Sequence, residues 1–316
     1  AAAHAQHMIS HIYVALGYWD ETVEANEKSF AVSEDRLRRK GRPIYDRSHH
    51  ALHWLEYGYL QQGRYRDALR TMGLMDDDAK ASGTEDNLWY HAMMRAGWLV
   101  ETGRWKDLPP ALPTDGVSLS AAAAGIFTQG WSSLLAGDRP GAEKALAEMR
   151  ERSRSAAEKA KEAEAGSSDN SRNLSSDFHT ADVLAKELEG LIAWDAGDRD
   201  RSIDLLRAAT AAEDAMPYEY GPPVVVKPSH ELLGEKLYDL GRYEDAWTQF
   251  AASLDRGPRR VLSLLGKARA ADRLGKSDDA AETWKTLAEI WKKADPDLPA
   301  LEEVRKMAPE PKRAAL

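Results

Sequence analysis

The chain has 316 residues, no cysteine and a formal net charge of −9 at pH 7. The lack of cysteine excludes disulfides and thiolate metal sites, and the acidic balance argues against nucleic-acid partners, which select a basic stripe on their binding proteins. No apolar run approaches the roughly 20 residues that a membrane-spanning helix needs, so we expect no membrane insertion.

The first segment, AAAHAQHMIS, reads as the interior of a helix. It has no initiator methionine and no N-capping residue, and it lacks the charged and apolar regions of a signal peptide. We therefore expect the natural chain to continue upstream of Ala1, and that N-terminal portion is one candidate partner of residues 1–316.

Turn signals then recur along the chain. At each of them a glycine follows a stretch with apolar residues at three- and four-residue spacing, and a second such stretch comes after it, as in LGYWDETV and QGRYRDAL. Glycine supplies the left-handed turn that closes one helix before another starts. The pattern predicts about seven antiparallel helical hairpins, with turns at Gly17, Gly63, Gly103, Gly137, Gly197, Gly241 and Gly275.

The sixth copy is the most regular one. It places small, aromatic and turn residues in the order Gly234, Leu237, Gly241, Tyr243, Ala246, Phe250 and Pro258. This order resembles the tetratricopeptide repeat (TPR), and the next turn glycine follows after 34 residues, the period of that repeat. The resemblance implies an all-α fold, a right-handed α-α solenoid in which the first helix of each hairpin lines a concave groove.

Three longer segments resemble a family of bacterial TPR proteins with His-rich first helices. They are HAQHMISHIYVALGYWDETVEANEKS, SHHALHWLEYGYLQQGRYRDAL and YEYGPPVVVKPSHELLGEKLYDLGRYEDA. The match covers most of the chain. It implies no particular activity, and it leaves both the periplasm and the cytoplasm of a bacterium open as locations.

Three segments interrupt the repeats. Prolines stop any helix within 105–120, and residues 151–180 read as a charged helix extension followed by an exposed Ser/Asn loop. Residues 216–229 hold four prolines and read as a strap that docks onto the solenoid. These breaks divide the chain into repeats over 1–150, the insertion at 151–180, further repeats over 181–309 and a tail at 310–316.

Groove-facing residues are expected thirteen, ten, six and three positions before each turn glycine, because these offsets keep to one face of a helix. They predict a groove that is His-rich at one end, aromatic in the middle and charged at the other end. A peptide, a protein or a small molecule would bind there. The two glutamates among the candidates also fit a solvated charge pair. The candidate binding residues are Tyr57, Tyr90, Met93, Phe127, Trp131, Trp194, Glu231 and Glu235.

Histidines concentrate at the N-terminal end of that groove. His7 and His11 have the i, i+4 spacing that lets two imidazoles converge on one metal ion, and the next repeat adds His53 or, as a substitute, His50. His4 is too far from His11 to share the ion and is expected to support the ligands from outside. Three imidazoles with an open fourth position suit Zn²⁺ or Cu²⁺. The same histidines also fit ordinary groove residues that contact a peptide.

Two functions remain open at this point. The first is a scaffold that binds a ligand or a protein in the aromatic and His-lined groove, and it rests on analogy of fold. The alternative is a metalloprotein or metalloenzyme with a His-ligated zinc or copper site at the N-terminal end of the groove. No phosphate-binding loop, nucleophile elbow or H-E-x-x-H motif is present, so the sequence assigns no catalytic residue.

Overall fold

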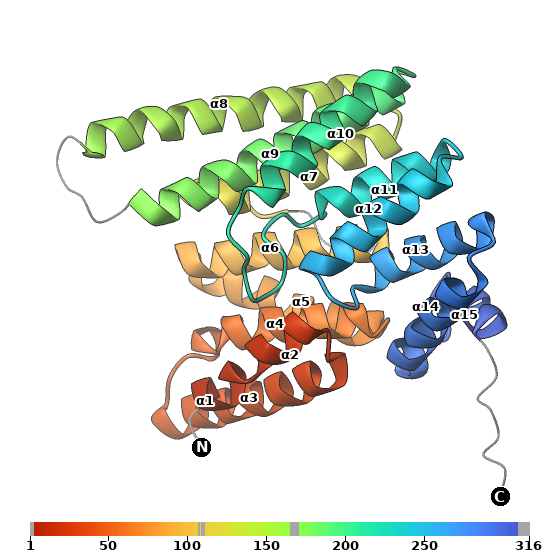
Figure 1. The fold of residues 1–316 in the computed structure, drawn as a ribbon. Coiled ribbons are helices and arrows are strands. Elements are labelled where there is room, and N and C mark those ends of the chain that lie inside the picture. The colour runs from red at the N-terminus through yellow and green to blue at the C-terminus, as the bar shows by residue number, and fades with distance from the viewer. Residues whose placement is uncertain (1–2, 107, 109–110, 165–170, 309–316) are drawn as a thin grey trace, which may run out of the picture.

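The computed structural model describes residues 3–106, 108, 111–164 and 171–308 (Figure 1). These residues form helices and irregular segments and no strand, which confirms the predicted all-α class. Short 3₁₀ helices cover Ile44–Asp46 and Trp291–Lys293. The α-helices are α1 (Ala3–Met8), α2 (Ser10–Leu16), α3 (Trp19–Lys40), α4 (His49–Gln61), α5 (Tyr65–Ser82), α6 (Glu85–Thr102), α7 (Leu119–Leu135), α8 (Arg139–Glu164), α9 (Ser171–Asp195), α10 (Arg199–Asp214), α11 (Ser229–Asp239), α12 (Tyr243–Arg256), α13 (Val261–Leu274), α14 (Ser277–Ile290) and α15 (Leu301–Met307).

Glycines end the first helices of the hairpins, as the sequence pattern predicts. All seven predicted turn glycines have a left-handed backbone with φ between 64° and 85°, a conformation that is unfavourable for residues with a Cβ atom. Six of them join two helices that pack against each other. The resulting hairpins are α2/α3, α4/α5, α7/α8, α9/α10, α11/α12 and α13/α14.

The hairpin expected at Gly103 does not form. Gly103 ends α6, but the described residues of 104–118 form no helix, and α7 begins only at Leu119. The prolines of this segment cannot continue a helix. Helix α6 therefore has no partner helix of its own and packs against α4, α5 and α7.

Small residues let neighbouring helices approach closely. Phe250 of α12 is buried between Gly234 of α11 and Gly266 of α13, and a Cβ atom added to these glycines would lie 2.9 and 2.2 Å from its ring. Gly130 and Gly190 meet leucine side chains in the same way. The small residue seven positions before the turn is thus a contact point in α7, α9 and α11.

Two interruptions differ in length from the prediction. Helix α8 runs to Glu164 and α9 begins at Ser171, so the expected Ser/Asn loop does not extend to residue 180. Residues 165–170 and the predicted tail at 310–316 lie outside the described residues. Residues 215–228, between α10 and α11, contain no helix, and we call this segment the strap.

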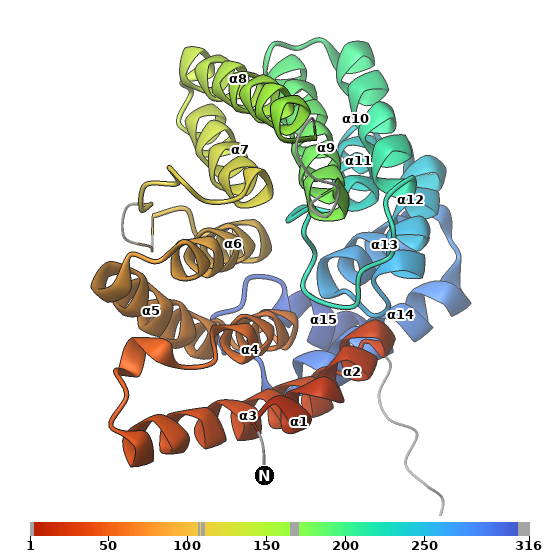
Figure 2. The ribbon, with the colours of Figure 1, turned by 90° about the vertical axis from the view of Figure 1, so that its left-hand side faces the viewer.

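The two ends of the stack of hairpins meet, so that the helices surround a central region (Figure 2). Trp291 Nε1 donates to the carbonyl oxygen of Gln61 at 3.1 Å, and the Asp295 N–H donates to that of Gly63 at 3.0 Å. The Val261 N–H donates to Gln61 Oε1 at 3.0 Å. One buried apolar cluster also draws residues from α2–α5 and α13–α15. We call this contact between the two ends the seam.

Candidate functional site

His7, His11 and His50 come together where α1, α2 and α4 meet. Their ligand nitrogens all lie within 4.8 Å of one another, and His7 Nε2 lies 3.1 Å from His11 Nε2. Two nitrogens bound to one tetrahedral zinc ion, with bonds of 2.0–2.1 Å, lie about 3.3 Å apart. This histidine cluster therefore has the dimensions of a metal site.

The tautomer of His7 follows from its neighbours. Asn26 donates its Nδ2 hydrogen to the carbonyl oxygen of Thr22 at 2.8 Å, which turns Asn26 Oδ1 toward His7. His7 Nδ1 lies 2.7 Å from that oxygen. Because an amide oxygen only accepts hydrogen bonds, Nδ1 carries the proton and Nε2 is left with a lone pair.

The other two rings also have an oxygen atom beside Nδ1. His11 Nδ1 lies 3.1 Å from the carbonyl oxygen of Tyr220, so it too carries the proton and leaves a lone pair on Nε2. His50 Nδ1 lies 3.3 Å from the Tyr90 hydroxyl. Partners that fix the outer nitrogen of an imidazole and orient its ring are typical of histidines that bind metals.

The two facing Nε2 atoms need a cation between them. Both present lone pairs at 3.1 Å, which is repulsive unless a proton or a metal ion is shared. Burial lowers the pKa of His7 to about 4, despite its hydrogen bond with Asn26. Burial also lowers the pKa of His50, with further contributions from His11 and His4. Burial thus disfavours a proton on His7, and a metal ion shared by the two Nε2 atoms fits this arrangement.

Trp54 forms one wall of the histidine cluster. Its ring centroid lies 4.2 Å from that of His11, 4.9 Å from that of His7 and 5.7 Å from that of His50. His7 is buried, His11 is half-buried and His50 is exposed. The cluster thus has a buried apolar side and a side that solvent can reach.

His53, the expected third ligand, lies outside the cluster. It is buried, and its ring contacts those of Trp89 and Tyr90 at centroid distances of 6.0 Å. Burial lowers the pKa of His53 to about 3. His50, the predicted substitute, takes its place beside His7. His4 is exposed, and it influences His7 and His50 through charge.

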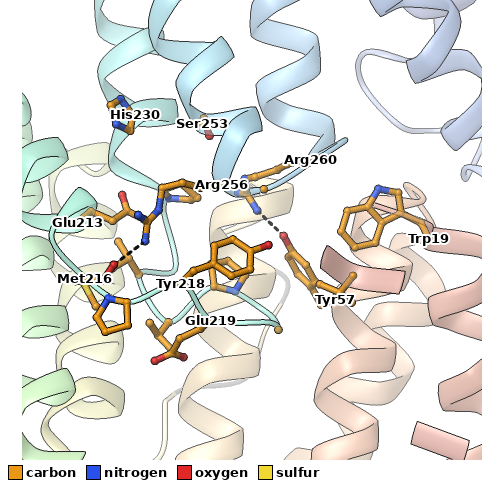
Figure 3. A pocket seen from close by; sticks show the side chains of 18 residues that line it. Trp19, Tyr57, Glu213, Met216, Tyr218, Glu219, His230, Ser253, Arg256 and Arg260 are labelled. Atoms are coloured by element: carbon orange, nitrogen blue, oxygen red, sulfur yellow. Dashed lines mark hydrogen bonds between the residues drawn. The ribbon is translucent and has the colours of Figure 1, made fainter. Parts of the chain in front are cut away.

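A second site, the central pocket, lies between the strap and the surrounding helices (Figure 3). Its space, with open solvent included, is about 790 Å³. Tyr218 of the strap, Trp19 of α3, Tyr57 of α4 and Arg256 of α12 line it. Among these residues, only Tyr57 belongs to the predicted groove.

The strap connects the two sites. The carbonyl oxygen of Tyr220 binds His11, and a Cβ atom on Gly221 would lie 2.9 Å from Trp54 Cζ2. Gly221 also lines the central pocket. One wall of the histidine cluster is therefore in contact with the segment that covers the pocket.

Buried charges anchor the C-terminal end of the strap. Lys227 donates to Glu231 Oε1 at 2.8 Å and to Glu235 Oε1 at 2.5 Å. Arg260 binds both oxygens of Glu231, at 2.8 and 3.0 Å, and pairs with Glu101 at 2.5 Å. Burial alone would raise the pKa of Glu231, but Arg260 and Lys227 lower it to about 2. Glu231, a predicted groove residue, thus holds helices and strap together.

The remaining predicted groove residues are scattered. Met93 and Phe127 are buried in the apolar core, and Tyr90 contacts His50. Trp131 packs against Trp105 with ring centroids 5.3 Å apart. Trp194 lies under the cations of Arg199 and Lys236, at 4.0 and 4.8 Å from its ring centroid. The structure does not bring these side chains together into one binding surface.

Sequence reasoning missed three residues that shape the two sites. Trp54 lies four positions after His50, so helical spacing could have placed it beside the histidines. Arg256 and Tyr218 follow from no spacing rule, because one ends α12 and the other belongs to the irregular strap.

Comparison of the sequence with protein-family models and with curated proteins gives no match. Among the described residues, no helix combines the length and the apolar character needed to cross a membrane.

Proposed function

We propose that this chain is a scaffold of tetratricopeptide type, a right-handed superhelix of hairpins, that holds one divalent transition metal ion at His7, His11 and His50. The observation that supports this proposal most directly is that His7 Nε2 and His11 Nε2 face each other at 3.1 Å. Both Nδ1 hydrogens are engaged by oxygen acceptors, so both facing nitrogens are free to ligate. The left-handed glycines between paired helices support the scaffold.

Three neutral imidazoles favour Zn²⁺ or Cu²⁺ over hard cations such as Mg²⁺. They leave one coordination position for water or for a ligand. Zinc lowers the pKa of bound water to about 7, so the same site would support hydrolytic chemistry in a metalloenzyme. The residues around the cluster are apolar or already hydrogen-bonded, and we assign none of them as a catalytic base.

Calorimetric titration of the tag-free chain with ZnCl₂ tests this function. We expect one equivalent of zinc to bind with micromolar or tighter affinity. His7→Ala and His50→Ala should each weaken binding by about tenfold or more, because each removes one of three nitrogen ligands. Cu²⁺ should quench the fluorescence of Trp54, and Trp54→Phe should reduce that quenching.

Two other histidines serve as controls. His4→Ala changes an exposed residue, and His53→Ala removes the ligand that sequence spacing favoured, so both should retain zinc affinity. Circular dichroism should establish that each variant is folded. The metal site does not exist if the unmodified chain binds no zinc at micromolar concentration or if His50→Ala binds it unchanged.

A second candidate function is the binding of a ligand inside the scaffold, in the central pocket and not along an open groove. The observation that favours it is the pocket itself, which combines aromatic walls with charged side chains. Pockets of this kind are the usual sites for small molecules.

A further inference from the structure

Three aromatic side chains, Trp19, Tyr57 and Tyr218, line the central pocket among aliphatic and charged residues, and the polar ends of Trp19 and Tyr57 are already engaged. Trp19 Nε1 donates to the carbonyl oxygen of Arg259 at 3.0 Å, and the Tyr57 hydroxyl accepts from Arg260 Nη1 at 3.1 Å. The two rings meet edge to face, with centroids 5.6 Å apart. Figure 3 shows Tyr218 of the strap beside Tyr57. These walls therefore offer ring surface to a ligand, and favour one with a flat apolar body.

Two arginines line the same pocket, and they differ in the hydrogen bonds and ion pairs that their guanidinium groups already make. The guanidinium of Arg260 is buried and binds Glu231, Glu101 and the Tyr57 hydroxyl. The guanidinium of Arg256 is half-buried and makes only a 3.5 Å hydrogen bond to the carbonyl oxygen of Met216. Within the described part of the chain, Arg256 forms no ion pair. It is thus the cation of the pocket that retains donors for a ligand.

Two acids, Glu213 and Glu219, also line the pocket. Glu213 is buried, and its Oε2 accepts the N–H of Ser229 at 2.7 Å. Burial raises the pKa of Glu213, which favours its uncharged form, while Arg256 opposes that shift. Glu219 is exposed on the strap. An anionic group in the pocket would therefore have Arg256 as its hydrogen-bond donor, beside a Glu213 carboxyl whose charged form burial disfavours.

We propose that the central pocket binds an aromatic carboxylate, with its ring against Tyr57 and Tyr218 and its carboxylate on the guanidinium of Arg256. This assignment rests on the second candidate function above and names its ligand class. The ring surface supplies apolar contact, and the guanidinium supplies paired N–H donors that match a carboxylate. A neutral amide of the same shape loses the charge-assisted hydrogen bonds, which makes the charge preference measurable.

Calorimetric titrations with 2-naphthoate, 2-naphthamide and 2-naphthylmethylammonium test the proposal on the full chain. We expect 2-naphthoate to bind about tenfold more tightly than the amide, and the ammonium compound to bind most weakly. Arg256→Gln should remove the preference for the carboxylate and leave the affinity for the amide unchanged. Tyr218→Ala, a change at a partly exposed residue, should weaken binding of both the carboxylate and the amide.

A surface arginine that precedes the same helix directly is the matched control. Arg242 lies at the start of α12 and pairs with Asp245 at 2.5 Å, so Arg242→Gln should leave all three affinities unchanged. If the carboxylate preference persists in Arg256→Gln, or if the amide binds as tightly as the carboxylate, the ligand class is wrong. If none of the three probes binds, or if Tyr218→Ala has no effect on their binding, the proposal that the central pocket binds a ligand is wrong as well.

Discussion

Glu56 lies inside the molecule at the edge of a small internal cavity, and its Oε1 atom has no hydrogen-bond partner. His53 and Pro222 of the strap line the same cavity. Burial raises the pKa of Glu56 well above its ordinary value, and the neighbouring Glu101 carboxylate adds to the shift. The folded protein therefore favours the protonated form of this carboxyl group.

Because the folded protein favours protonated Glu56, its stability depends on pH. Above about pH 4.5 the unfolded chain releases the proton of Glu56 while the folded chain retains it, so stability falls as pH rises toward the folded pKa. Glu56→Gln keeps the shape but does not ionise. We expect it to increase the free energy of unfolding at about pH 8 by about 1.4 kcal/mol for each unit of the pKa shift, and to have little effect at about pH 5.

Urea unfolding at both pH values measures the effect of Glu56→Gln. The control is Glu282→Gln, a change at an exposed residue of α14, which should alter stability equally little at both pH values. An identical effect of Glu56→Gln at the two pH values would show that Glu56 does not titrate differently in the folded and unfolded chains.

At the scale of helices, the sequence predicted a feature correctly where residues close in the chain determine it. Left-handed glycines mark turns because only glycine adopts that backbone without strain, and the close contacts of Gly234 and Gly266 follow from the packing of Phe250. The choice between His50 and His53 has no local cause. The spacing of three residues allows either to face α1, and the packing of α4 against α6 turns His53 toward Trp89.

The path of the strap could not be predicted for a similar reason. Its prolines exclude a helix, but they do not say which surface the segment covers. Its tip is positioned by long-range contacts, between Tyr220 and His11 and between Gly221 and Trp54. The first of these contacts joins residues 209 positions apart, a separation that no sequence window covers.

The same contacts predict that metal binding stabilises the strap. A metal on His11 Nε2 fixes the tautomer in which Nδ1 donates to the Tyr220 carbonyl, so strap docking and metal affinity are linked reciprocally. We expect zinc to slow hydrogen exchange of the amides of residues 218–221, as measured by mass spectrometry. Gly221→Ala places a Cβ atom 2.9 Å from Trp54 and should weaken zinc binding several-fold.

Gly257→Ala is the matched control for that experiment. Gly257 also lines the central pocket, but its added Cβ would make only ordinary contacts, at 3.6 Å and beyond. Zinc affinity should therefore remain unchanged. Unaltered exchange in the strap, in a sample that calorimetry shows to be loaded with zinc, would rule out the coupling.

At the scale of the whole molecule, the seam is the feature that repeat periodicity does not indicate. In an open solenoid each repeat contacts only its neighbours, and stability is a sum of local terms. Here a Cβ atom added to Gly17 would lie 2.2 Å from the carbonyl oxygen of Pro258, so the two ends are in close contact. Arg259 has a left-handed backbone with φ of 59°. Such a conformation is uncommon for a residue with a side chain and is retained where the surrounding structure imposes it.

Gln61 tests whether the seam couples the two ends. Its side chain is fully buried, accepts the Val261 N–H at 3.0 Å and donates to Glu101 at 3.2 Å. Gln61→Leu leaves the buried Val261 N–H without a hydrogen bond, at a cost of about 1–3 kcal/mol, whereas Glu101 keeps its ion pair with Arg260. In a closed ring, hydrogen exchange should accelerate both in α2–α5 and in α13–α15, while α7–α10 remain protected.

Gln249→Leu is the control, because it breaks a hydrogen bond to His230 between α11 and α12. Its effect on hydrogen exchange should not reach α2–α5. Faster exchange confined to α4 and α5 in Gln61→Leu would mean that the ends are independent and that the seam contributes little to stability.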